Sequence, residues 1–165
     1  MNAKDEVVDW LRDAYAMERG LEVTLEKISR SHDYPAEIRQ AAARHVEETR
    51  EHARTVDALL KEVGAETSTV KTGMGMMTEA VKGLTTSLLH DDPVKDLLAS
   101  YSMEHFEIAC YNALAAAAEV AGLPEVAEAC ADIISDEEAM AETLHDSLPK
   151  IVRDYLASQK FSRAA

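Results

Sequence analysis

Residues that break helices occur at only a few places in this sequence, and they separate long stretches with helical periodicity. The breaks fall at Ser31–Pro35, at Gly64, at Pro93 and at Gly122–Pro124. The stretches between them are rich in Ala, Glu, Leu, Val and Met, which have high helix propensity. The pattern therefore predicts four long helices, over residues 3–31, 36–63, 93–121 and 125–158.

The lengths of the links between these helices predict how they associate. The first and second helices, and the third and fourth, are joined by short links, which favour two antiparallel hairpins. Residues 64–92 form a long crossover that we expect to carry one or two short helices. The 165 residues thus predict a single all-α domain over 1–165, folded as a four-helix bundle with one long crossover.

Composition excludes several classes of partner. The formal net charge is −14, which argues against nucleic acid because phosphate binding needs a basic surface. No apolar run approaches the roughly 18–20 residues that cross a bilayer, so no membrane association is expected. The first residues lack the pattern of a signal peptide, and the two cysteines form no Cys-x-x-Cys pair. These features predict a cytoplasmic protein with reduced thiols.

Charged residues interrupt the apolar stripes of the first two helices. In the first helix, Glu18 lies on the stripe formed by Leu11, Leu21 and similar residues. In the second helix, the middle of the stripe holds three groups that can bind metal: His45, Glu48 and His52. Ionised carboxylates seldom enter a protein core unless they are paired or bound to a cation.

The third and fourth helices repeat this pattern. Glu104 lies on the stripe of the third helix, and Glu107 lies on its shoulder. In the fourth helix we place the stripe along Ala127, Ala131, Ile134, Glu138, Glu142, His145 and Val152. Glu137 then projects about a quarter turn away from this stripe.

Distances along the chain predict that these acids share one level of the bundle. Glu18 lies fifteen residues before Asp33 in the first turn, and Glu48 lies fifteen residues after it. The second hairpin likewise sets acids opposite acids. Like charges so close repel strongly in a low dielectric, and a pair of divalent cations would remove that cost. Carboxylates with one or two imidazoles suit iron or manganese. Bridging Glu residues would hold two such ions roughly 3.5–4 Å apart.

At these residues the chain resembles the ferritin-like superfamily and, within it, the YciE/YciF-type stress proteins of bacteria. The matching segments lie within residues 5–157 and are Leu11–Glu18, His45–Thr49, Met103–Tyr111 and Asp136–Glu138. The resemblance implies a bundle able to bind two metal ions, often dimeric and induced under stress. The Glu104-x-x-Glu107 spacing is also similar to that of rubrerythrin-type centres, although position 51 is Glu where their pattern has His.

The predicted metal ligands are Glu18, His45, Glu48, Glu104, Glu107, Glu138 and Glu142. His45 is favoured as the imidazole ligand, but His52 could take that place, because each lies one turn from Glu48. We expect no catalytic residue separate from this site. Residues placed to orient the ligands, relay protons or transfer electrons are Glu22, His52, His145, Tyr15, Tyr101 and Tyr111.

Three functions are compatible with such a site. The first is oxidation of Fe(II) by O₂ or peroxide at two divalent ions, iron in preference to manganese, in a cytoplasmic homodimer. The second is a stress protein that holds metal or a partner without turnover. The third has no metal, and protonated carboxyl groups form a hydrogen-bonded network in the core.

Overall fold

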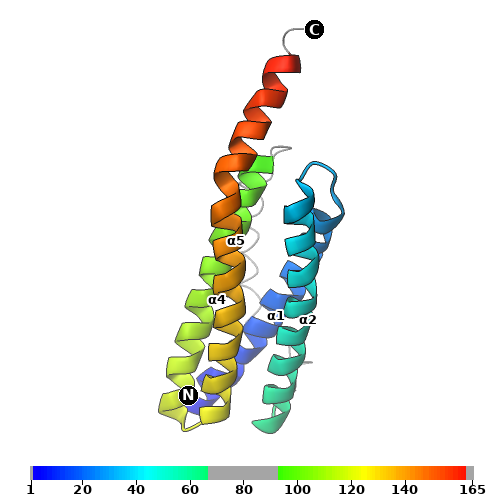
Figure 1. The fold of residues 1–165 in the computed structure, drawn as a ribbon. Coiled ribbons are helices and arrows are strands. Elements are labelled where there is room, and N and C mark those ends of the chain that lie inside the picture. The colour runs from blue at the N-terminus through cyan, green and yellow to red at the C-terminus, as the bar shows by residue number, and fades with distance from the viewer. Residues whose placement is uncertain (1, 67–92, 163–165) are drawn as a thin grey trace.

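Four helices run side by side in a computed structural model that describes residues 2–66 and 93–162 (Figure 1). They are α1 (Ala3–Arg30), α2 (Ala36–Glu62), α4 (Pro93–Ala121) and α5 (Pro124–Ser162). The predicted all-α bundle of two antiparallel hairpins is confirmed. The predicted short helices of the crossover lie mostly outside the described residues.

Local sequence signals set the helix ends. Asn2 caps α1 through a capping box with Asp5, in which each side chain bonds the other's backbone N–H. Gly64 and Gly122 follow α2 and α4 with φ of +81° and +70°, which L-residues with a side chain seldom adopt. Pro93 and Pro124 open α4 and α5, where a missing N–H costs nothing.

The two hairpins pack so that α1 contacts α2 and α4, while α5 contacts α4 and α2. Helix α5 is longer than expected, because it continues to Ser162 rather than ending at residue 158. Its last turns extend past the ends of the other helices (Figure 1). None of the described helices combines the length and the apolar character needed to span a membrane.

The core consists of two apolar clusters at different heights. The first cluster lies toward the start of α1 and includes Val7, Leu11, Val56, Leu60 and Leu114. The second lies toward the turn between α1 and α2 and includes Leu25, Ile28, Ile38, Leu97 and Leu144. Along α2 and α5 the two clusters are separated by buried polar residues. The candidate site lies at this boundary.

Candidate metal centre

Each of the four helices contributes a buried ionisable side chain at the boundary between the two apolar clusters. We call these residues the polar layer: Glu18, His45, His52, Glu104, Glu107 and Glu137. All are at most 4% exposed, which is exceptional for acids and therefore requires compensating partners.

Helix α1 supplies Glu18. It lies between Ala14 and Leu21 on the buried face, so the amphipathic pattern of α1 carries its carboxylate into the core. Tyr111 of α4 donates its hydroxyl to Glu18 Oε1 at 2.5 Å. That bond fixes one carboxylate oxygen, whereas Oε2 of Glu18 is buried with no hydrogen-bond partner.

Helix α2 supplies two histidines, which share a face because they are seven residues, or nearly two turns, apart. The Nε2 atom of His45 lies 3.1 Å from Glu104 Oε2 and 3.1 Å from Glu137 Oε2. The Nδ1 atom of His52 lies 3.1 Å from Glu137 Oε1 and 3.7 Å from Glu18 Oε2. Glu137 of α5 thus lies between the two imidazoles, with one oxygen facing each ring.

These contacts change the protonation of the polar layer. Burial lowers the pKa of both imidazoles, but their acidic neighbours outweigh it and raise that of His45 to about 11 and that of His52 to about 10. Burial likewise raises the pKa of Glu137, but the two imidazoles lower it to about 2. At neutral pH, Glu137 is therefore a carboxylate between two imidazolium ions.

The other acids of the layer respond mainly to burial. Burial raises the pKa of Glu104 to about 8, and it raises the pKa of Glu18 and Glu107 as well. Without metal, protons therefore occupy positions where cations could bind, and metal binding would displace them.

The donor atoms fit divalent cations. Ligand atoms of Glu18, His52 and Glu137 lie within 4.8 Å of one another, and so do those of His45, Glu104 and Glu137. Glu137 belongs to both groups. Each of its oxygens forms an ion-pair contact of 3.1 Å with an imidazole nitrogen, but neither contact has hydrogen-bond geometry, so both oxygens are buried without a hydrogen bond. Such unsatisfied oxygens are costly unless something binds them.

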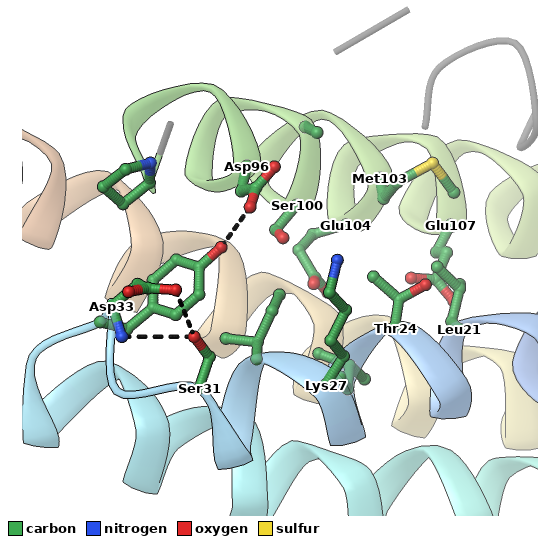
Figure 2. A pocket seen from close by; sticks show the side chains of 15 residues that line it. Leu21, Thr24, Lys27, Ser31, Asp33, Asp96, Ser100, Met103, Glu104 and Glu107 are labelled. Atoms are coloured by element: carbon green, nitrogen blue, oxygen red, sulfur yellow. Dashed lines mark hydrogen bonds between the residues drawn. The ribbon is translucent and has the colours of Figure 1, made fainter. Parts of the chain in front are cut away.

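A cavity of about 380 Å³ lies beside the polar layer, between α1 and α4 (Figure 2). Glu104 and Glu107 contribute to its lining, together with apolar side chains such as Leu25 and Met103. Thr24 and Ser100 also line it, and such small side chains leave space between the two helices. A small molecule in this cavity would be close to two carboxyl groups of the polar layer.

Four of the predicted ligands do reach the polar layer: Glu18, His45, Glu104 and Glu107. Tyr111 also lies where a residue that orients ligands is expected, because it bonds Glu18. His52 is expected either to bind metal or to orient the ligands, and its ring lies within the layer beside Glu18 and Glu137.

Three predicted ligands lie at exposed positions outside the polar layer: Glu48, Glu138 and Glu142. The expectation that they lie on buried helix faces is wrong. On α5 the predicted stripe is displaced by one residue. The buried positions are Val126, Cys130, Ile133, Glu137, Met140, Ala141, Leu144 and Ile151. A displacement of one residue rotates a helix by about 100°, which turns Glu138 outward and Glu137 inward.

The remaining predicted residues lie around the layer rather than in it. Glu22 accepts hydrogen bonds from Arg19 and Arg50. Tyr15 is half-buried and packs against the first apolar cluster. Tyr101 packs against two histidine rings, with its centroid 4.6 Å from that of His105 and 5.9 Å from that of His145. His145 is exposed.

Sequence reasoning missed one acid of the layer and one of its outer contacts. Glu137 lies off the stripe predicted for α5, but the structure buries it completely. Asp136, the residue before it, is exposed and lies 3.1 Å from His52 Nε2. The apolar residues Val126, Cys130 and Ile133 are spaced like a helix face that includes Glu137, and they were the available signal.

Comparison with known proteins assigns the family. The model of the family described as Domain of unknown function (DUF892) matches residues 2–157, nearly the whole chain. The chain belongs to the DUF892 family. Among solved structures, a protein from Xanthomonas campestris is 34% identical, with a TM-score of 0.79, covering 97% of this chain and 99% of that one.

Two more distant structures show the fold that the DUF892 chain shares. The Escherichia coli stress protein YciF is 23% identical, with a TM-score of 0.70, covering 93% of this chain and 98% of YciF. A dodecameric thioferritin from Bacteroides fragilis, a bacterioferritin-related protein, is 19% identical, with a TM-score of 0.72. That match covers 95% of this chain and 92% of the thioferritin. The ferritin-like fold and the resemblance to YciF-type proteins are thereby confirmed.

Proposed function

We propose that this protein binds two divalent metal ions in the polar layer and oxidises Fe(II) with O₂ or peroxide. One ion would be held by His45 and Glu104, and the other by His52 and Glu18. Glu137 would bridge the two ions. The observation that carries this proposal is the position of Glu137, whose two oxygens are buried without a hydrogen bond and each face one of the two histidines.

The chemistry of the donors favours iron, with manganese as the alternative. Carboxylates combined with imidazoles suit both metals, and the layer holds no cysteine. Two Fe(II) ions held there would each supply one electron. With two protons, these electrons would reduce one O₂ to hydrogen peroxide, or one hydrogen peroxide to two waters. Glu107 has a carboxyl group at the cavity beside the site and could complete the ligand set there.

The residues around the ions would hold them in place and limit access. Tyr111 fixes one oxygen of Glu18, so that the other faces His52. The two apolar clusters exclude water from above and below the layer. The cavity between α1 and α4 would admit a small oxidant to the side of the site lined by Glu104 and Glu107 (Figure 2).

The test uses adjacent acids on α5. Anaerobic titration should show two Fe(II) bound per wild-type chain, and added O₂ or peroxide should then oxidise them faster than in buffer. We expect Glu137→Ala to lower that rate at least tenfold, because it removes the shared ligand. Glu138→Ala removes the same charge from an exposed position and should leave the rate unchanged.

Each alternative function gives a different result in this test. Binding of two ions without faster oxidation would mean that the protein holds metal without turnover. Failure to bind iron, manganese or zinc would leave only the network of protonated carboxyl groups. Equal rates for Glu137→Ala and Glu138→Ala would contradict oxidation at the polar layer.

We further propose that the chain acts as a homodimer in the cytoplasm during stress, as its resemblance to the YciE/YciF-type proteins implies. The related thioferritin is described as a dodecamer, so larger assemblies occur within the same fold. Light scattering should give a mass of twice 18.1 kDa. A monomer would contradict the dimer without affecting the metal site.

A further inference from the structure

Each histidine of the polar layer contacts an exposed acid as well as buried ones. The Nδ1 atom of His45 lies 2.8 Å from Glu48 Oε2, and the Glu48 side chain is 46% exposed. The Nε2 atom of His52 lies 3.1 Å from Asp136 Oδ2, and the Asp136 side chain is 52% exposed. Both rings are therefore held between the protein surface and the core.

The nitrogen that faces the core differs between the two rings. For His45 it is Nε2, which approaches Glu104 and Glu137. For His52 it is Nδ1, which approaches Glu137 and Glu18. The two halves of the site are thus unlike, even though both use one histidine, one acid of their own and the shared Glu137.

Building on the proposed function, we propose that Glu48 and Asp136 are positioning residues that present opposite nitrogens of the two histidines to the metal ions. His45 binds its ion through Nε2, and His52 binds its ion through Nδ1. Neither outer acid contacts metal in this arrangement.

The reason lies in the chemistry of imidazole. A neutral ring has one N–H donor and one nitrogen lone pair, and only the lone pair can bind metal. A carboxylate that accepts the N–H fixes both the tautomer and the ring orientation, so that the lone pair points the other way. Glu48 does this for His45, and Asp136 does it for His52.

The two outer acids reach their histidines differently. Glu48 is three residues after His45 on the same helix, so this pair depends on α2 alone. Asp136 is carried by α5 and contacts His52 across the helix interface, next to the shared ligand Glu137. The orientation of His52 therefore depends on the packing of α5 against α2.

The direct test is ¹⁵N NMR of the zinc-loaded protein with labelled histidine. Nε2 couples to both ring carbon-bound protons, whereas Nδ1 couples strongly only to Hε1, so the protonated nitrogen can be identified. Signals are assigned with the variants His45→Gln and His52→Gln. We expect His45 to keep its proton on Nδ1 and His52 to keep its proton on Nε2. Binding of both rings through the same type of nitrogen would overturn the proposal.

A second test follows zinc occupancy through the same two ring signals. Loss of a partner that orients a ligand typically weakens metal binding about 10–100-fold. Glu48→Ala should weaken binding at His45 by about this factor and change binding at His52 less than twofold. Asp136→Ala should have the reverse effect. Glu48→Gln and Asp136→Asn keep an acceptor oxygen and should partly restore affinity.

Matched controls remove one exposed acid from the same helices. Glu51→Ala on α2 and Glu138→Ala on α5 should change neither site, since neither side chain contacts the polar layer. Equal weakening of both sites by either outer-acid variant would contradict a positioning role. If the wild-type protein binds two zinc ions but fails these tests, this inference fails alone. If it binds none, the proposed function fails too.

Discussion

The polar layer and the apolar clusters beside it are equally buried, yet they contribute to the fold in opposite ways. The first cluster packs Leu11, Val56 and Leu60, whose burial stabilises the bundle without any partner. The polar layer removes Glu18, Glu104 and Glu107 from water at a cost that protons only partly offset. The difference supports the proposal that the clusters maintain the fold, whereas the layer binds metal.

The largest effect should come from supplying metal to the layer. A ligand at 1,000 times its Kd stabilises a protein by about 4 kcal/mol for each site. Since about 1 kcal/mol shifts Tm by roughly 2–4 °C at this size, zinc should raise Tm by about 10 °C or more. Calorimetry with zinc and with EDTA measures this. Glu137→Ala should lose most of the gain, and an equal gain in that variant would place the metal elsewhere.

Truncation of the first apolar cluster should have the next largest effect. Leu11→Ala removes a fully buried side chain and leaves a cavity, so we expect a loss of about 2–5 kcal/mol. Urea unfolding of the metal-free protein measures this loss. Val23 is an exposed residue of the same helix, and Val23→Ala should cost less than about 0.5 kcal/mol. Similar losses in both variants would contradict the assigned core.

The opposite change in the polar layer should stabilise the metal-free protein. Among the described residues, no group forms a hydrogen bond with the Glu107 carboxyl, and burial raises its pKa well above the usual value. Glu107→Leu should therefore gain about 1 kcal/mol, at the low end of what is found when buried charges are replaced by apolar groups. Thermal unfolding in EDTA measures it. A clear loss of stability would mean that Glu107 has a structural role.

The polar layer should also make the stability of the metal-free form depend on pH. The pKa values of His45 and Glu104 are raised to about 11 and 8 in the folded protein. Each group therefore stabilises the fold fully at pH values below its pKa in the unfolded chain, and this stabilisation is lost as pH rises toward its pKa in the folded protein. The lowered pKa of Glu137, about 2, acts oppositely, and its stabilisation is lost as pH falls below about 4.5. Tm in EDTA should thus be highest near pH 5 and fall toward pH 9.

Bound zinc should change this profile. Metal binding requires deprotonated ligands, so the gain in Tm on adding zinc should increase as pH rises from 5 to 8. Thermal melts at three pH values, with and without zinc, give both trends. A gain that is independent of pH would contradict the displacement of protons from the polar layer.

The sequence was sufficient to predict which face of α1 is buried, but not which face of α5 is buried. On α1, Leu21, Leu25 and Ile28 are each flanked by polar residues or glycine, so they define one stripe, and Glu18 lies on it. On α5, apolar residues occur in adjacent pairs such as Val126–Ala127, Cys130–Ala131 and Ile133–Ile134. Two neighbouring stripes are then equally apolar, and only packing against α4 and α2 selects the one that contains Glu137.

Helical periodicity predicts that His45 and Glu48 are neighbours, but it does not predict the contact between His52 and Asp136. Periodicity gives the face on which a residue lies, but it does not give the rotation of an imidazole ring. The contact between Asp136 and His52 joins α5 to α2, so it depends on how the two hairpins dock. The level of the site was predictable, because the distances of Glu18 and Glu104 from their turns are fixed by chain length.

The most direct test of the account is anomalous scattering from crystals of the protein soaked in manganese. We predict two peaks on opposite sides of the Glu137 carboxylate, roughly 3.5–4 Å apart. One peak should lie beside His45 and Glu104, and the other beside His52 and Glu18. Peaks found only at exposed acids such as Glu138 and Glu142, or a polar layer that stays empty at saturating manganese, would contradict a two-metal site.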